Sequence, residues 1–527
     1  MSELSLQGFL TECEREQLHR VQSIQPQGCL LGGRTGSPIV RFASANLEDW
    51  VGRPLKVVLG QPIAALMPDF PPTTEIADLA EAEAADAWMR PSADKRLYPE
   101  LFQGVKGALD GLLSCDESHW LLELEASLPA SQRHEAYRPV SHRLYRMPYS
   151  EHDWATHCQY LADELRAASG FERVMVYRFR EDGCGEVISE SLVEGLPPYL
   201  GLRYPASDIP RIARDIYLLN SHRQIPDIDA LPVPILDPDG DSLDLTLSDL
   251  RAVSPVHLEY LANMGVTASL SFSVRVAGEL WGLVACHHRV PRHLPLPVRE
   301  RCAEMVQVFT LAIAGYQSTR RMVELNESDQ EITALLEALR QADSGQDVGV
   351  DPGLTSSRIA GPTLGEALMS LVDATGAALV DARTIVTFGQ TPDIAAIRAM
   401  ANWFNEAIRE PIFATDQLSA HYPEAASLSG LASGLLAVRV ENFRDQAERC
   451  FFWWRPEQPR AVHWAGDPRK SALFDAQRQR LSPRSSFERW IETTSGHSEP
   501  WATSARLRAQ KFRGLVLRDV NADILRR

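Results

Sequence analysis

The sequence lacks any run of about 20 apolar residues that could cross a bilayer. Its first residues also lack the basic-then-apolar order of a secretion signal, so we expect a cytoplasmic protein that does not enter a membrane. Positive charge is not in excess, because 53 lysines and arginines stand against 70 aspartates and glutamates, for a net charge of −17. We therefore expect no binding of nucleic acid through net charge.

Paired cysteines are also missing. The eight cysteines are scattered, with no C-x-x-C pair and no cysteine–histidine spacing typical of a metal site. We expect reduced thiols and no bound metal, so that any cysteine chemistry is carried by a single thiol. The sequence likewise contains no glycine-rich loop of the nucleotide-binding type.

The composition is that of a globular protein, with 44% hydrophobic and 23% charged residues in 527. Short strand-like runs alternate with helical patterns, which predicts three consecutive α+β domains with antiparallel sheets and flanking helices, joined by long helices. The expected boundaries are residues 1–125 and 126–320 for the first two domains, 321–345 for a connecting helix, 346–503 for the third domain and 504–527 for a last helix.

The second domain has the clearest pattern. We predict a helix over residues 154–168, a strand over 173–179, and a closing hairpin of strands 268–276 and 280–287. Between these elements, residues 226–255 are rich in proline and aspartate and show little periodicity. A stretch of this length without structure of its own is usually functional or disordered.

Two helical patterns suit a parallel homodimer. In the helix predicted over 298–342, a heptad-type seam with one polar interruption comprises Met322, Leu325, Asp329, Ile332, Leu336 and Leu339. The last helix, from Ser504, repeats apolar residues every fourth position, at Phe512, Val516, Val520 and Ile524. A helix that faces the core of its own domain gives the same pattern as a dimer seam.

The third domain contains an insertion-like arm at about residues 450–490. Its parts are an aromatic strand over 451–455, a return strand around 462–464, and a basic, polar run that ends near Phe487.

Four motifs carry a family resemblance. Residues 205–210 read PASDIP, residues 23–28 read SIQPQG and follow Cys13, residues 281–288 read WGLVACHH, and residues 483–487 read PRSSF. By itself PASDIP indicates only a helix start, with Ser207 or Asp208 as its cap and Pro210 in its first turn. Together the motifs extend along nearly the whole chain, and they resemble those of phytochromes, in particular the photosensory core of a bacteriophytochrome.

The resemblance implies PAS, GAF and PHY domains in that order, an N-terminal figure-of-eight knot, and a tongue in the PHY domain that corresponds to the arm. Residues 226–255 would be a lasso, with Ile24 at the crossing. The protein would be a red/far-red photoreceptor, not an enzyme, that holds biliverdin through a thioether to Cys13. Biliverdin is implied because Val256 stands where plant and cyanobacterial phytochromes carry their thiol.

The resemblance also implies a set of pocket residues: Tyr177, Tyr204, Asp208, Ile209, Pro210, Tyr217, Arg223, Arg251, His257, Tyr260, Ser269, Ser271 and His287. Arg223 and Arg251 would bind the two propionates, since bidentate arginine suits carboxylates. Ser269 and Ser271 would assist them from one face of a strand. The backbone carbonyl of Asp208 would accept from the pyrrole N–H groups.

Histidines and tyrosines complete this implied pocket. His257 would lie near the same ring nitrogens, and His287 would contact the ring D carbonyl, with Tyr177 and Tyr204 nearest to ring D. His288 follows His287 on a strand, so its side chain should point to the opposite face.

The tongue provides the implied switch. Arg484, in the motif that also holds Ser486, would pair with Asp208. Light would isomerise the bilin at C15=C16, ring D would turn, and the contact between Asp208 and Arg484 would be exchanged. Gln27, Ala465 and the pair Gln17-Leu18 depart from the family's pattern, and we expect these departures to affect spectral tuning and the tongue.

Two other functions would place different demands on the sequence. A PAS/GAF sensor of a small molecule such as a cyclic nucleotide would not need Cys13 or the tongue motif. A cysteine hydrolase based on Cys286 would need a histidine beside the thiol, but Cys286 and His287 are strand neighbours that point apart. The family's usual output is a histidine kinase. No such region is found in this sequence, so we expect a downstream output domain or a response regulator as partner.

Overall fold

The computed structural model describes residues 17–67, 95–136, 138–180, 182–237, 240, 243–343, 364–381, 384–441, 448–468, 472–475, 480–483 and 486–522. Cys13, Arg484 and Ile524 lie outside these residues, as do the side chains of Leu325, Leu339 and Val520. The chain divides into two compact units, one made of Met1–Tyr316 and His463–Trp490, the other of Gln317–Val462 and Ile491–Arg527. Among the described residues, no helix is long and apolar enough to cross a membrane.

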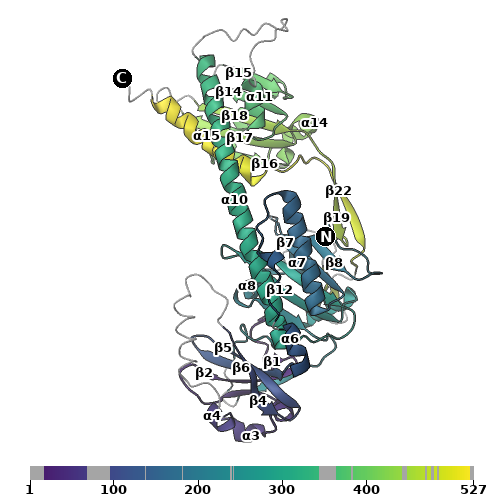
Figure 1. Ribbon diagram of the computed structural model, residues 1–527. Coiled ribbons are helices and arrows are strands. Elements are labelled where there is room, and N and C mark those ends of the chain that lie inside the picture. The colour runs from purple at the N-terminus through teal and green to yellow at the C-terminus, as the bar shows by residue number, and fades with distance from the viewer. Residues whose placement is uncertain are drawn as a thin grey trace. The chain divides into compact units, whose positions relative to one another are not determined.

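The first sheet has seven antiparallel strands in the order β1-β11-β3-β2-β6-β5-β4 (Figure 1). They are β1 (Ser23–Ile24), β2 (Gly28–Arg34), β3 (Phe42–Ser44), β4 (Arg96–Gly104), β5 (Gly107–Cys115), β6 (His119–Ala126) and β11 (Val233–Leu236). Buried side chains of α2 (Leu47–Val51), α3 (Leu55–Val58) and α4 (Ile63–Leu66) share one core with this sheet. Strand β11 comes from the proline-rich segment, which is thereby tied to the first sheet.

Ile24 lies at the predicted crossing. It pairs with Val233 on one side, forms a bridge with Arg251 on the other, and is fully buried. The Ala252 N–H donates to the carbonyl of Ser23 at 2.9 Å. The described part of the N-terminal strand therefore passes between two stretches of residues 226–255, as the lasso requires.

The second sheet has the order β10-β12-β13-β7-β8-β9-β19-β22. Its strands are β7 (Arg173–Phe179), β8 (Gly185–Leu192), β9 (Arg203–Tyr204), β10 (His222–Ile225), β12 (Ala268–Val276), β13 (Glu279–His288), β19 (Arg460–Ala465) and β22 (Arg489–Thr494). Neighbouring strands in the series β10-β12-β13-β7-β8-β9 pair antiparallel, whereas β19 pairs in parallel with β9. The predicted strands 173–179 and 268–276 are confirmed as β7 and β12.

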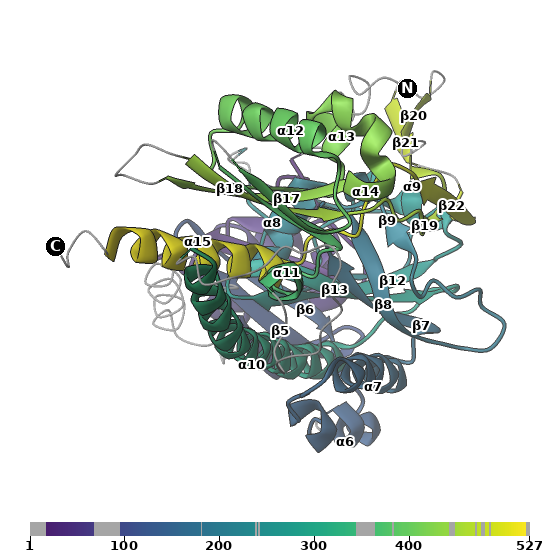
Figure 2. The same ribbon diagram turned by 90° about the horizontal axis from the view of Figure 1, so that it is seen from above.

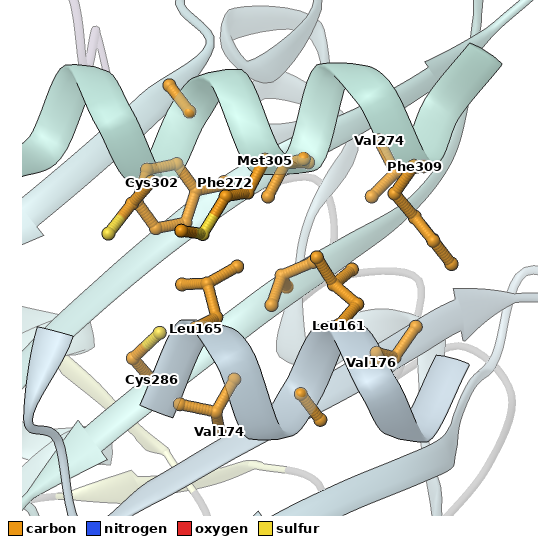
Figure 3. Close-up of a cluster of buried hydrophobic side chains, with 14 of the residues drawn as sticks. Leu161, Leu165, Val174, Val176, Phe272, Val274, Cys286, Cys302, Met305 and Phe309 are labelled. Atoms are coloured by element: carbon orange, nitrogen blue, oxygen red, sulfur yellow. The ribbon is translucent and has the colours of Figure 1, made fainter. Parts of the chain in front are cut away.

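Two helices cover one face of this sheet, α7 (Glu151–Ser169) and α10 (Leu296–Asp343). Figure 3 shows Leu161 and Leu165 of α7 and Met305 of α10 in the core between the helices and the strands. The Ser150 hydroxyl caps α7, and Gly170 ends it with a left-handed φ of 64°. Both helices agree with the predicted ranges. Short turns precede α7: η1 (Ala130–Gln132), α6 (Arg133–Ala136) and η2 (His142–Tyr145).

The third sheet, order β15-β14-β18-β17-β16, is antiparallel. It comprises β14 (Gly376–Val380), β15 (Ile385–Gly389), β16 (Ile412–Thr415), β17 (Gly434–Glu441) and β18 (Glu448–Arg455). Figure 2 shows helices on both of its faces. They are α11 (Leu364–Ser370) and α15 (Thr503–Ala522) on one face, and α12 (Ile394–Ala407), α13 (Leu418–His421), η4 (Pro423–Leu428) and α14 (Ser429–Ala432) on the other.

The aromatic strand over 451–455 was expected in the arm, and this is wrong. It is β18, the middle strand of the third sheet, between β14 and β17. Its aromatic residues alternate between two cores, Phe451 and Trp453 toward α15, Phe452 and Trp454 toward α12. A strand covered on both faces is apolar throughout, which the sequence pattern did not distinguish from an exposed arm. The described arm consists of β19, β22 and the small hairpin β20 (Ala472–Asp475) with β21 (Arg480–Pro483).

The predicted dimer seam is also corrected. Ile332 and Leu336 of α10 are buried in the same core as Phe512 and Val516 of α15. Asp329, the polar interruption, forms an ion pair with Lys511 of α15. These positions pack within the chain because α10 and α15 share one domain core, whereas Met322 remains 63% exposed.

Candidate functional site

A cavity opens on the face of the second sheet opposite α7 and α10. Its walls come from the sheet, α8 (Arg211–Leu219), α9 (Pro255–Asn263) and the segment from Arg251 to Ser254 that leads into α9. All the pocket residues expected from the resemblance line this one cavity: Tyr177, Tyr204, Asp208, Ile209, Pro210, Tyr217, Arg223, Arg251, His257, Tyr260, Ser269, Ser271 and His287. Residues from distant parts of the sequence thus meet in one place.

One end of the cavity is positively charged. Arg223 of β10 lies opposite Ser271 of β12, and it donates to the backbone carbonyls of Asp249 at 3.2 Å and Ala252 at 3.1 Å. Burial, with the positive charge of Arg251 beside it, lowers the pKa of Arg223 to about 9. Arg251 is itself buried, and its Nη1 has no hydrogen-bond partner among the described residues. Two guanidinium groups therefore face the cavity with capacity for an anion.

Hydroxyl groups lie next to the arginines. The Tyr217 and Ser271 hydroxyls are 2.6 Å apart, and Ser269 is on the same strand face two residues away. Ser269 lies opposite His287 of β13. The shared face of β12 thus connects the arginine end of the cavity to the histidine end.

The histidine end contains two rings that the fold keeps neutral. His257 is exposed to the cavity although protein surrounds it, and desolvation, with the charge of Arg223, lowers the pKa of its imidazole to about 4. Burial, with the charges of Arg173 and His257, lowers the pKa of His287 to about 3. His287 Nδ1 is buried without a partner in the part of the chain that the structure describes.

The neighbours of His287 point away from the cavity, as expected for a strand. The Glu172 N–H donates to Nδ1 of His288 at 3.2 Å. Cys286 is fully buried in the core on the opposite sheet face, where Figure 3 shows it near Val174, and burial raises the pKa of its thiol well above the usual value. A protonated thiol in an apolar core does not provide a nucleophile, which argues against the hydrolase.

The PASDIP segment differs from its expected local structure. Residues Ala206–Asp208 form a 3₁₀ turn, and Pro210 is the N-cap of α8, with no side-chain cap. The expected cap by Ser207 or Asp208 is wrong, because the Asp208 carboxylate instead accepts a hydrogen bond from the Tyr260 hydroxyl at 2.8 Å. Asp208 is thereby fixed to α9 at the edge of the cavity.

The arm reaches the cavity. Pro483 lines it, and the Phe487 ring lies perpendicular to the Tyr260 ring at 5.0 Å. Ala465, where the family often has glycine, is fully buried in a cluster with Tyr177 and Tyr204, so its methyl group fits. Ser486, in contrast, is exposed and does not line the cavity.

Sequence reasoning missed Ser207 as a cavity residue. Its hydroxyl is buried without a partner among the described residues and lies at the cavity wall. It stands inside the PASDIP motif, which was the available signal. Leu18, one of the departures from the family's pattern, also lines the cavity, so the N-terminal segment reaches it.

The unpaired groups test whether a linear tetrapyrrole fits. A buried polar group without a partner costs about 1–3 kcal/mol, so Ser207 Oγ, Arg251 Nη1 and His287 Nδ1 call for a polar ligand in the same space. A bilin offers carboxylates for the arginine end, ring carbonyl and N–H groups for the histidine end, and an apolar body for the tyrosines and Met175. The described residues contain no histidine, cysteine and carboxylate cluster that could hold a metal ion.

Comparisons with known proteins give the same domain order. Family models match a PAS fold at residues 13–97, a GAF domain at 153–315 and a phytochrome region at 362–523. The bacteriophytochrome of Xanthomonas campestris pv. campestris is 33% identical, over 96% of this chain and 78% of its own length. The chain belongs to the phytochrome family.

Other phytochromes agree along the whole chain. Cyanobacterial phytochrome B of a Nostoc species is 34% identical over 96% of this chain, which spans 66% of the length of that relative. A crystal structure of a bacteriophytochrome from the photosynthetic bacterium R. palustris superposes with a TM-score of 0.76 at 32% identity, and the match covers 97% of this chain and 99% of that one. The chain is thus a PAS–GAF–PHY phytochrome photosensory core, and a bilin chromophore follows from its bacteriophytochrome relatives. These relatives do not favour the light-independent ligand sensor.

Proposed function

We propose that this phytochrome is a red/far-red photoreceptor that holds biliverdin through a thioether from Cys13. The observation that carries the proposal is the one cavity in which all the expected pocket residues meet, with buried polar atoms at both ends that have no partner among the described residues. Arg223 and Arg251 form no ion pair with a carboxylate among the described residues, which suits a ligand with two carboxylates. The apolar and aromatic wall between the two ends suits a conjugated body.

Different residues of the cavity bind different groups of the bilin. Arg223 and Arg251 bind the propionates, assisted by Ser269 and Ser271. The Asp208 carbonyl and His257 meet the pyrrole N–H groups, and His287 meets the ring D carbonyl. Neutral histidines suit these contacts, since a neutral imidazole can either donate or accept through a given nitrogen, depending on its tautomer.

Light absorption by the bound bilin supplies isomerisation of its C15=C16 bond between the 15Z and 15E forms. The protein's part is to couple this to the tongue. Tyr177 and Tyr204 share a buried cluster with Ala465 of the tongue, and Asp208 is bonded to Tyr260, on which Phe487 packs. A shift of Tyr177 and Tyr204, or of Tyr260, therefore acts directly on tongue residues. Exchange of the Asp208–Arg484 contact would complete the switch.

The proposal includes a parallel homodimer and a downstream output domain or response regulator. Large apolar side chains on α10 that remain exposed, Leu311 at 72% and Met322 at 63%, support self-association.

The test is an absorption spectrum of protein reconstituted with biliverdin, before and after red light, with zinc-induced fluorescence of the denatured protein to detect a covalent bilin. We expect reversible red to far-red conversion, and loss of covalent colour in Cys13→Ser. Failure to take up biliverdin would refute the proposal. Retention of covalent bilin by Cys13→Ser would refute the attachment site alone.

A further inference from the structure

The first domain contributes buried carboxylates to the surroundings of the cavity. Strand β6 places Glu123 and Glu125 two positions apart, hence on one face of the first sheet, and each is 1% exposed. Glu125 pairs with Arg299 of α10 and contacts His293. Glu123, in contrast, binds the backbone segment that leads to Arg251.

This binding uses three consecutive residues. Glu123 Oε1 accepts from the Ser248 hydroxyl at 2.5 Å and from the Leu250 N–H at 2.8 Å, and Oε2 accepts from the Asp249 N–H at 3.0 Å. Burial and the nearby Asp249 carboxylate raise the pKa of Glu123, but three donors converge on its carboxyl group, and a buried donor that loses its acceptor costs free energy, so these hydrogen bonds are costly to break. They fix the backbone immediately before Arg251.

The same backbone is held from the other side by a cavity arginine. The carbonyls of Asp249, Arg251 and Ala252 all accept from Arg223. The Asp249 carboxylate contacts Lys95, and it also contacts Nε2 of His222, next to Arg223, at 2.8 Å. Displacing residues 248–250 would therefore displace both arginines.

Arg251 depends on this support more than Arg223 does. Its Nη1 has no partner among the described residues, so its backbone is a main determinant of where that end of the guanidinium points. A residue that holds residues 248–250 accordingly decides how Arg251 meets an anion in the cavity.

We propose that Glu123 of the PAS domain is a positioning residue that orients Arg251 and Arg223 for the two carboxylates of the chromophore. The inference rests on the proposed function and extends it: the first domain sets the preference of the GAF cavity for a ligand with two anionic groups. Glu123 acts through the backbone of residues 248–250 and does not itself line the cavity.

The experiment compares biliverdin with its dimethyl ester, which has the same ring system without the two negative charges. A Cys13→Ser background makes binding reversible, and absorption titration gives both affinities. We expect Glu123→Gln to weaken biliverdin binding about tenfold and ester binding less than about twofold, because the variant acts only through the carboxylates. Glu125→Gln is the matched control, an equally buried carboxylate on the same strand face, and it should change both affinities by equal factors.

Ser248→Ala provides a second, milder variant should Glu123→Gln not fold. It removes one of the three donors to Glu123, and it should weaken biliverdin binding more than ester binding, by a smaller factor. Equal losses for the two ligands in these variants, or no loss, would overturn the positioning role while the proposed function stands. Absence of biliverdin binding both in the Cys13→Ser parent and in the protein that retains Cys13 would overturn both.

Discussion

Gly185, at the start of β8, allows the Tyr177 ring to reach its place in the cavity wall. A Cβ atom at Gly185 would lie 1.7 Å from Cζ of that ring, far inside van der Waals contact. The position of the Tyr177 ring in the cavity wall thus requires glycine at position 185. The same contact offers a way to move Tyr177 without changing its chemistry.

We expect Gly185→Ala to push the Tyr177 ring aside, to destabilise the GAF domain by about 1–3 kcal/mol, and to shift the absorption spectrum of the bilin-bound protein. Urea unfolding and absorption spectra measure the two effects. Gly430→Ala is the control, because a Cβ at Gly430 meets no atom within 4 Å. A Gly185→Ala protein with the parent's spectrum would show that Tyr177 does not contact the chromophore.

The neutral histidines make the bilin-free protein sensitive to acid. Unfolded histidines titrate near pH 6.5, whereas His257 and His287 take up a proton only near pH 4 and pH 3 in the folded state. The unfolded state therefore binds more protons between these values, and stability falls as the pH drops below about 6.5.

Urea unfolding at pH 7.5 and 5.0 tests this expectation, with His257→Gln/His287→Gln as the comparison. The doubly substituted protein should lose less stability between the two pH values than the parent does. An identical loss in both proteins would assign the acid sensitivity to other groups.

For single residues the sequence was informative mainly through motifs, with one exception. Strand alternation alone predicted that His287 and His288 face opposite ways, and the structure confirms it. The hydrogen bond from Tyr260 to Asp208 was not predictable, because it joins residues 52 positions apart, and local pattern suggested a helix cap instead. The lack of a partner for Arg251 Nη1 among the described residues was not predictable either, because it depends on how distant segments assemble around the cavity.

At the scale of elements, periodicity predicted which segments are helices and strands, but it did not predict what these elements pack against. α10 was predicted nearly to its ends, yet its heptad-type seam packs against α15 and the third sheet rather than offering Ile332 and Leu336 to a partner. The spacing of apolar residues indicates that a helix face is buried, but it does not indicate whether the same chain or a partner subunit covers that face. The aromatic strand β18 was assigned to the arm for the same reason, since its apolar sequence indicates burial but not which elements cover it.

We expect Phe512→Ala in α15 to destabilise the third domain by about 3–5 kcal/mol, since Phe512 is fully buried against Phe451 and Trp453. Met322→Ala, at the exposed seam position, should change stability by less than about 0.5 kcal/mol. Urea unfolding gives both values, and light scattering gives the oligomeric state. If Phe512→Ala dissociated a dimer while the domain kept its stability, the helix would belong to a subunit interface after all.

At the scale of the whole chain, buried charges join the first domain to the second. Glu125 of β6 and Arg299 of α10 form an ion pair in which each side chain is 1% exposed. Although burial opposes it, the charge of Arg299 lowers the pKa of Glu125 to about 2. The stabilisation from this pair is therefore present above about pH 4.5 and is lost as the pH falls toward 2.

We expect Arg299→Met to destabilise the joined PAS and GAF domains by about 3–5 kcal/mol, because it leaves the Glu125 carboxylate buried without its main partner. Adding Glu125→Gln should recover part of this loss. Thermal unfolding of the single and double variants at pH 7 measures both. Equal stability of the single variant and the parent would mean that His293 alone compensates Glu125.

The crossing at Ile24 also constrains when this protein can fold. Ile24 needs Val233 and Arg251 as backbone partners, and neither exists until more than two hundred further residues have been synthesised. At about 5–20 residues per second, the strand waits some 10–45 s on the ribosome before Ile24 can meet either of these backbone partners. Faster translation, or a chaperone that binds the strand meanwhile, would thus increase the fraction of chains in which the N-terminal strand passes between the two stretches of residues 226–255. The yield of folded photoreceptor would then be determined during translation.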